Sequence, residues 1–244
     1  MKKVALITGA SRGLGARLAV EFARDGYRMA INYHTHRAAA ESVTNSIGRG
    51  GGEAICVRAD VRVARDVEAM VSAVLTKWGR LDVLVNNAGI AHESLLLSTS
   101  EEQWDRVMDI NLKGAFLCTR AAARRMMRQR SGHIINICSI LGVWGGRGES
   151  AYATSKAALI GFTRSAAREL GRYAICVNAV IPGFMMTGMG RICSEAARER
   201  ARGMNVLTRL SDIGTAARVI VHLAGTTSVS GQLFNCDGRI YRWA

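Results

Sequence analysis

The sequence is poor in proline and in aromatic residues: Pro182 is its only proline, and aromatic residues make up 6% of its 244 positions. It also lacks a long hydrophobic run. The apolar stretch that begins at Val4 stops at Thr8-Gly9, and the segment from Cys176 to Met189 is broken by Pro182 and two glycines. The first is too short for a signal peptide, and neither is a membrane span. We therefore expect a cytoplasmic protein with long helices and strands and no membrane segment.

The cysteines lack the spacings of functional pairs. Six are present, but none forms a C-x-x-C pair and their spacing is not typical of zinc ligands, so we expect reduced thiols and no metal site. Apolar residues make up 49% of the chain and charged residues 21%, which is typical of a globular protein. The length suits one layered α/β domain, which we expect to span residues 1–244.

Acidic residues are few. Lys and Arg outnumber Asp and Glu by 33 to 19, which gives a formal net charge of +14. Such a surplus suits an anionic partner: nucleic acid, an acidic carrier protein or a phosphorylated cofactor. The basic residues are spread along the chain, and no patch interleaves them with aromatic residues, so we do not expect nucleic-acid binding.

Short β-branched or apolar segments alternate with stretches whose apolar residues recur every three or four positions. The expected strands are Val4–Thr8, Arg28–Tyr33, Ala54–Val57, Leu81–Asn86, His133–Cys138, Ile175–Val180 and Gln232–Asn235. The expected helices are Gly13–Asp25, Arg37–Ile47, Ala64–Trp78, Glu101–Arg128, Ala151–Leu170 and Asp212–Leu223. This alternation predicts a doubly wound, Rossmann-type α/β fold, a parallel sheet of about seven strands with helices on both faces. Ligands bind such a sheet at the carboxyl ends of its strands.

A glycine-rich turn joins the first expected strand to the first helix. Its spacing, G-x-x-x-G-x-G, meets the general dinucleotide fingerprint only in part, and a glycine turn without function is the alternative. No Lys-Ser or Lys-Thr follows, which argues against a P-loop ATPase. Because glycines have no side chain, they allow a pyrophosphate to approach the backbone closely, and the free N–H groups and the dipole of the helix attract it. The candidate cofactor contacts here are Gly9, Ser11, Arg12, Gly13, Leu14 and Gly15.

The end of the second strand lacks the acidic residue that usually binds the ribose of NAD. The segment Asn32-Tyr33-His34-Thr35-His36-Arg37 contains no carboxylate. Arg12, Arg37 and His34 could pair with a 2′-phosphate, which an acidic residue would repel, so the sequence favours NADP(H) over NAD(H). The alternative is that these are solvated surface residues.

Tyr152 and Lys156 are four residues apart in an expected helix and so lie on one face of it. A nearby ammonium favours the ionised form of a phenol and brings it toward the pH range of a useful acid or base. Ketone reduction needs such an acid, because hydride transfer to the carbonyl carbon leaves an alkoxide that must be protonated. Most Y-x-x-x-K pairs are only neighbours on a helix surface.

Two further residues strengthen this prediction. Ser139 follows the strand His133–Cys138, where the crevice of the sheet opens, and its hydroxyl could bind the substrate carbonyl, although a turn or cap serine is the alternative. Asn111 lies inside an expected helix, where asparagine is an indifferent helix former that needs a polar partner if buried. The residues alone do not single out Asn111 as catalytic.

Six motifs in order resemble the short-chain dehydrogenase/reductase family, and specifically its 3-oxoacyl-[acyl-carrier-protein] reductase branch. They are Thr8 to Gly15, Ala59-Asp60-Val61 with Asn86 to Gly89, Asn111, Ser139 with Tyr152 to Lys156, Pro182 to Thr187, and Gly231 to Gly238. The resemblance implies that Tyr152 is the acid/base, that Lys156 lowers its pKa and holds the ribose, that Ser139 polarises the ketone and that Asn111 anchors a relay water. It also implies cofactor contacts from Asp60, Val61, Asn87, Ala88, Gly89, Pro182, Gly183, Met185 and Thr187.

The resemblance also implies partners. Family members commonly form tetramers through the helices that contain Asn111 and Tyr152 and through the C-terminal strands. In the carrier-protein branch, basic residues beside the mouth of the active site receive the acidic carrier, and Arg130 and Arg172 are our candidates for this contact. A solvated arginine face with little energetic effect is the alternative.

Three features depart from the branch: Arg239 after Asp237-Gly238, Tyr173-Ala174 before the sixth strand, and Leu210-Ser211-Asp212 without a proline. They leave the catalytic residues untouched but weaken the assignment of substrate, which depends on residues 144–149 and 185–205. The leading hypothesis is a 3-oxoacyl thioester reductase. The alternatives are a coenzyme A thioester, a sugar, a polyketide-type substrate or another ketone or alcohol as substrate, a non-catalytic NADP(H) sensor, and, remotely, a nucleic-acid binder.

Overall fold

The fold is built around one parallel sheet, seen in a computed structural model that describes residues 2–187 and 195–240. Within these residues the sheet has seven strands in the order β3-β2-β1-β4-β5-β6-β7. The strands are β1 (Val4–Ile7), β2 (Arg28–Tyr33), β3 (Ala54–Arg58), β4 (Val83–Asn86), β5 (Gly132–Ile137), β6 (Ile175–Ile181) and β7 (Leu233–Asn235). Every neighbouring pair is parallel, which confirms the predicted fold class.

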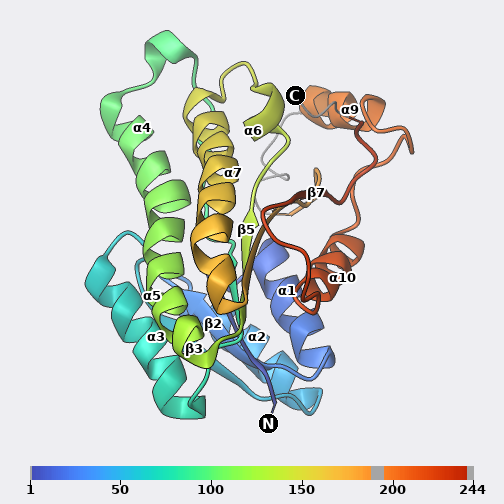
Figure 1. The fold of residues 1–244 in the computed structure, drawn as a ribbon. Coiled ribbons are helices and arrows are strands. Elements are labelled where there is room, and N and C mark those ends of the chain that lie inside the picture. The colour runs from blue at the N-terminus through green and yellow to red at the C-terminus, as the bar shows by residue number, and fades with distance from the viewer. Residues whose placement is uncertain (1, 188–194, 241–244) are drawn as a thin grey trace.

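Helices cover both faces of the sheet, which explains why its central strands are mostly apolar (Figure 1). One face packs against α1 (Gly13–Arg24), α2 (Arg37–Arg49) and α10 (Ile213–Leu223). The other packs against α3 (Ala64–Trp78), α5 (Gly114–Gln129) and α7 (Ser150–Leu170). Strands β1, β4 and β6 are buried along their whole length between the two layers.

The strand order reverses between β1 and β4, and this point positions the candidate site. From β1 the chain winds outward through β2 to β3, then returns to β4 on the other side of β1 and continues outward to β7. The loops after β1 and β4 therefore leave the sheet in opposite directions and open a crevice at the carboxyl ends of these strands. In Figure 1 this end of the sheet is the upper one, next to α6 (Leu141–Trp144).

The helix predicted over Glu101–Arg128 is not a regular α-helix along its whole length. It consists of α4 (Glu101–Met108), a π-helical turn η2 (Asp109–Lys113) and α5. A π turn inserts extra residues into the helical spiral and rotates the side chains that follow it. Asn111 lies inside this turn, so the prediction of a regular helix was wrong at the candidate catalytic residue itself.

Several short elements were not predicted. They are α6, the helix α9 (Glu195–Gly203) and the 3-10 turns η1 (Leu96–Ser98) and η3 (Gly171–Tyr173). Part of the expected substrate segment, residues 188–194 with Cys193, lies outside the described residues. None of the helices within residues 2–187 and 195–240 combines the length and the apolar composition needed to cross a membrane.

The departures from the family pattern have structural roles near the C-terminus. Arg239 is buried and forms an ion pair with Asp237. The backbone of Arg239 also forms an antiparallel β-bridge with Asn205, which follows α9. Asp212 caps α10 by accepting a hydrogen bond from the backbone N–H of Thr215, which satisfies a helix-end donor. Ala174 adopts a left-handed backbone conformation (φ 56°) where a glycine turn is more usual.

Candidate active site

The glycine turn after β1 is shaped to admit a ligand close to its backbone. Gly9 and Gly13 have φ angles of 61° and 60°, which side chains disfavour. A Cβ atom at Gly9 would lie 2.9 Å from the Cα of Ala88, so only glycine fits against the loop after β4. Arg12 occupies the N-cap of α1, and its side chain caps none of the N–H groups of the first turn. These donors are therefore available to an anion, as a pyrophosphate site requires.

Hydrogen bonds from neighbouring strands hold this turn in place. The Thr8 hydroxyl accepts from the backbone N–H groups of Asn87 and Ala88, both at 3.0 Å. The Asn87 amide donates back to the Thr8 carbonyl at 2.9 Å, and Asn32 accepts from Gly9 N–H at 3.1 Å. The loop that contains Asn87, Ala88 and Gly89 is thereby attached to the glycine turn across β1 and β4.

The remaining residues of the turn take different positions. Leu14 and Gly15 are buried in the first turn of α1, where Leu14 belongs to the core. Ser11 is half-buried, and Arg12 is exposed. Thr187 lies over Gly13, since a Cβ there would be 3.7 Å from the Thr187 Cβ. The segment from Pro182 to Thr187 after β6, with Met185 buried, therefore lies against the glycine turn, as expected for residues that share one cofactor.

A basic cluster stands beside the turn, with a member that the sequence did not single out. The Arg12 guanidinium lies 3.4 Å from the Nε2 atom of His36, which precedes α2. Arg37 instead bonds Glu41 at 2.7 Å, and this pair holds the pKa of Arg37 above its ordinary value. His34 lies 3.7 Å from the Asp60 carboxylate. Three basic residues were predicted to bind a 2′-phosphate. Of these, Arg12 is the one that lies next to a further basic side chain, His36, which was not predicted.

Asp60 and Val61 follow β3 at the same edge of the sheet. Arg62 forms a two-pronged ion pair with Asp60 and, as the main cause, lowers the pKa of that carboxyl. The Asp60 carboxylate is therefore ionised and fixed in orientation. Val61 is buried and packs against Gly114 at the start of α5.

The candidate acid and its lysine lie on α7, near the carboxyl end of β5. Lys156 is 4% exposed, and its Nζ atom donates a 2.7 Å hydrogen bond to the Ile137 carbonyl at the last residue of β5. The same Nζ lies 5.7 Å from the centre of the Tyr152 ring. Burial lowers the pKa of Lys156, because desolvation disfavours its charged form. The structure thus brings the predicted pair together beside the end of a central strand.

Ser139 lies two residues beyond β5, in the turn that leads into α6. Its hydroxyl accepts a hydrogen bond from Leu141 N–H at 3.2 Å, so part of its hydrogen-bonding capacity serves the turn. Gly142 brings α6 against α7 at the position of Lys156, since a Cβ on Gly142 would be 2.7 Å from the Lys156 carbonyl carbon. The helix α6, which follows the Ser139 turn, is therefore in direct contact with α7, which contains Tyr152 and Lys156.

The side chain of Asn111 forms three hydrogen bonds at the π turn. Its Oδ1 atom accepts from Ile90 N–H at 2.8 Å, and its amide donates to the Ile90 carbonyl at 2.9 Å and to the Ser155 hydroxyl at 3.0 Å. Ser155 in turn donates to the Tyr152 carbonyl at 2.7 Å. Asn111 is therefore connected to the loop after β4 and, through Ser155, to the tyrosine's own turn of α7. The sequence offered no signal for Ser155.

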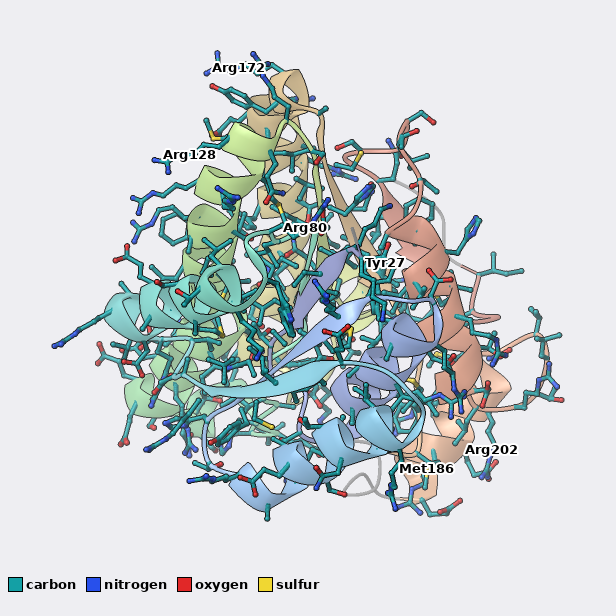
Figure 2. All side chains as sticks on the ribbon, turned by 90° about the horizontal axis from the view of Figure 1, so that it is seen from below. Tyr27, Arg80, Arg128, Arg172, Met186 and Arg202 are labelled. Carbon is teal, nitrogen blue, oxygen red and sulfur yellow. The ribbon has the colours of Figure 1, made fainter. Side chains whose placement is uncertain are left out.

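Arg130 and Arg172 lie together, but they do not lie at the mouth of the candidate active site of the same chain. Arg130 donates to the Arg172 carbonyl at 3.3 Å, and both guanidinium groups stack over Tyr173. They follow α5 and α7, which run opposite to the strands, so they lie at the amino end of the sheet. Figure 2 looks onto this end, and Arg128 and Arg172 project outward from it. From Tyr152 to Leu170, α7 extends about 27 Å along its axis.

The fold and this arrangement define a class: a dinucleotide-dependent enzyme with a Tyr–Lys pair at the carboxyl end of a parallel sheet. No group of three or more His, Cys, Asp or Glu side chains suitable for a metal ion occurs in the described part of the chain. The family model of the short chain dehydrogenases matches residues 3–198. The chain belongs to the short-chain dehydrogenase/reductase family, and it is an oxidoreductase that uses a nicotinamide cofactor.

Its relatives cover almost its whole length. The chain is 41% identical over 243 residues to the 3-oxoacyl-[acyl-carrier-protein] reductase FabG of Staphylococcus aureus (strain Mu50), with 99% of each chain aligned. It is 40% identical to the 3-oxoacyl-[acyl-carrier-protein] reductase of Synechocystis sp., over 97% of this chain and 96% of that one. A crystal structure of a dehydrogenase/reductase from Sinorhizobium meliloti matches with a TM-score of 0.91 and 35% identity, over 97% and 94% of the two chains.

Proposed function

We propose that the protein reduces the ketone of a 3-oxoacyl thioester, bound to an acyl carrier protein, to a secondary alcohol with NADPH. The observation that supports this most directly is the placement of Tyr152 and Lys156 beside the end of β5, next to the turn of Ser139. The full-length similarity to reductases named for this reaction supports the choice of substrate.

In this reaction each residue has a distinct task. The Ser139 hydroxyl binds the ketone oxygen, and Tyr152 donates its phenolic proton to that oxygen as negative charge develops there. The buried Lys156 ammonium, held by the Ile137 carbonyl, favours the phenolate that remains. As the family resemblance implies, a water anchored by Asn111 would return a proton from solvent. When bound, the nicotinamide supplies the hydride that the carbonyl carbon accepts.

The residues of the glycine turn fit an NADP(H) cofactor. The uncapped first turn of α1 would hold the pyrophosphate, and Lys156 the nicotinamide ribose. Asp60 and Val61 would hold the adenine, while Asn87 to Gly89 and Pro182 to Thr187 would flank the dinucleotide. Arg12, with His36 beside it, would pair with the 2′-phosphate, for which the absence of a carboxylate from residues 32–37 is also favourable.

The first test is a set of initial rates with purified protein. We expect NADPH to be oxidised in the presence of an acetoacetyl thioester, with kcat/KM at least about tenfold higher than for NADH because a 2′-phosphate gains a charge-assisted pair. The thioester on an acyl carrier protein should give a lower KM than the same acyl group on coenzyme A. A ketone without a thioester that is reduced faster than both would contradict the proposed substrate, and equal rates with NADH would contradict the cofactor.

A further inference from the structure

In the part of the chain that the structure describes, one carboxyl group at the candidate site has a buried oxygen without a hydrogen-bond donor. Glu149 is the residue before α7, three positions ahead of Tyr152. Its Oε2 atom is buried and has no hydrogen-bond partner among residues 2–187 and 195–240. A glutamate at an N-cap could bond the free N–H groups of the helix, but this side chain makes no such bond. Its ionised form is therefore costly, since a buried carboxylate needs compensating donors.

A second carboxylate faces Glu149 from the loop after β4. The two segments are joined by a hydrogen bond of 2.9 Å from Ser94 N–H to the Gly148 carbonyl, and a Cβ on Gly148 would be 3.3 Å from the Cγ of Glu93. Burial raises the pKa of Glu149 to about 7, and the charge of Glu93 adds to this rise. Other ionisable groups on these segments are His92, half-buried beside Glu93, and Arg147, which is exposed. On α7 the buried Lys156 bonds Ile137 instead.

The position of Glu149 gives its charge a consequence for catalysis. Glu149 is the N-cap of α7, and its carbonyl accepts a 2.7 Å hydrogen bond from the N–H of Ala153, the residue after Tyr152, so Glu149 adjoins the first turn of α7, which contains Tyr152. Ketone reduction places negative charge on the carbonyl oxygen and then on the tyrosine oxygen. A carboxylate nearby opposes both, whereas a neutral carboxyl does not.

We propose that Glu149 acts as a charge switch for the reaction, holding its proton when the ketone is reduced and opposing reduction once that proton is lost. The inference rests on the proposed function. Glu149 touches neither the hydride nor the transferred proton: the hydride moves to the carbonyl carbon, and the proton moves from Tyr152 to the oxygen. Glu93 positions the switch, because its negative charge keeps the proton on Glu149 to higher pH.

The test is the pH dependence of kcat for ketone reduction at saturating NADPH. In the wild type, kcat should fall roughly tenfold as pH rises through the titration of Glu149, as expected for a carboxylate near a developing anion. Glu149→Gln keeps the size of the side chain without its charge, so this fall should disappear and turnover at pH 8 should exceed that of the wild type. Glu93→Gln removes the charge that raises the pKa, so the fall should move to lower pH.

The control is Glu169→Gln, on the exposed face near the far end of α7, which should leave the wild-type profile unchanged. The KM for NADPH should be the same in all four proteins, which a general loss of folding would not give. The inference is overturned if Glu149→Gln keeps the fall, or if Glu93→Gln moves it to higher pH or leaves it in place. A wild type without any ketone reductase activity would instead contradict the proposed function.

Discussion

Gly142 lies where α6 meets α7, and its missing side chain sets how closely the two helices approach. A Cβ at this position would be 2.7 Å from the carbonyl carbon of Lys156 and 2.8 Å from the backbone nitrogen of Ala157. Both are backbone atoms of a long helix and cannot move aside easily. An alanine would therefore displace α6 and the Ser139 turn that precedes it.

We expect Gly142→Ala to lower kcat with the acetoacetyl thioester and to destabilise the protein by about 1–3 kcal/mol, the usual cost of overpacking. Gly161→Ala on α7 is the matched control. No atom lies within 4 Å of its missing Cβ, so this change should stabilise the helix by about 0.5–1 kcal/mol and leave kcat unchanged. Thermal unfolding and initial rates measure both effects. If Gly142→Ala had the turnover of the wild type, the contact between α6 and α7 would not position Ser139.

Individual site residues differ in how well the sequence announces them. Tyr152 and Lys156 follow from helical spacing, and Ser139 from its place after a strand. Ser155 and His36 could not be predicted, because their roles come from contacts between residues that are distant in the sequence. Ser155 contacts Asn111, and His36 contacts Arg12, which lies 24 positions earlier. Glu149 was included only in a loop expected to affect the substrate, since its burial depends on how Glu93 and the loop fold around it.

The seven strands and the long helices were predicted with their types and order, and each predicted bound lies within two residues of the observed one. The alternation of apolar segments determines this layout, because each strand is covered on both faces. The exception is the π turn η2 between α4 and α5. No proline or glycine marks residues 109–113, and the π turn there is accompanied by the hydrogen bonds of Asn111 to Ile90. Such long-range contacts leave no local pattern.

The direction of α5 and α7 constrains where a carrier protein can dock. Both helices end at the amino end of the sheet, and so Arg130 and Arg172 lie far from the Tyr152 of the same chain. Their predicted position beside the mouth does not hold within one protomer. We propose that these arginines serve the site of a second copy, packed with its α5 and α7 antiparallel to those of the first, as in the tetramer that the family resemblance implies.

The double variant Arg130→Glu/Arg172→Glu should raise the KM for a carrier-bound acetoacetyl substrate about tenfold or more, because opposite charges become like charges. The KM for the coenzyme A thioester should stay unchanged. Arg164→Glu, an exposed arginine of α7, is the control for a general change in net charge. An unchanged KM for the carrier-bound substrate in the double variant would exclude this docking site, and an equal rise in both KM values would indicate damage to the active site.

The whole molecule combines a positive net charge with a crevice at the carboxyl ends of its strands. The basic residues that give the net charge of +14 are spread over the chain, as the sequence indicated. Two of them, Arg130 and Arg172, lie over the ring of Tyr173 at the amino end of the sheet. The parallel sheet is continuous from β3 to β7 and was predicted correctly. The single domain, the tetramer and the cytoplasmic location stay predictions, because they depend on partners and compartments rather than on contacts within one chain.

The central claim is that the phenol of Tyr152 donates the proton in ketone reduction, and replacing Tyr152 with phenylalanine tests it most directly. Initial rates with NADPH and the acetoacetyl thioester should fall by about 10²–10⁴-fold, the contribution of a positioned general acid. NADPH binding, measured by fluorescence titration, should persist because the glycine turn is untouched. Tyr173→Phe, at the other end of α7, should keep its rate with the coenzyme A thioester. If Tyr152→Phe retained wild-type turnover, the assignment of the proton donor would be wrong.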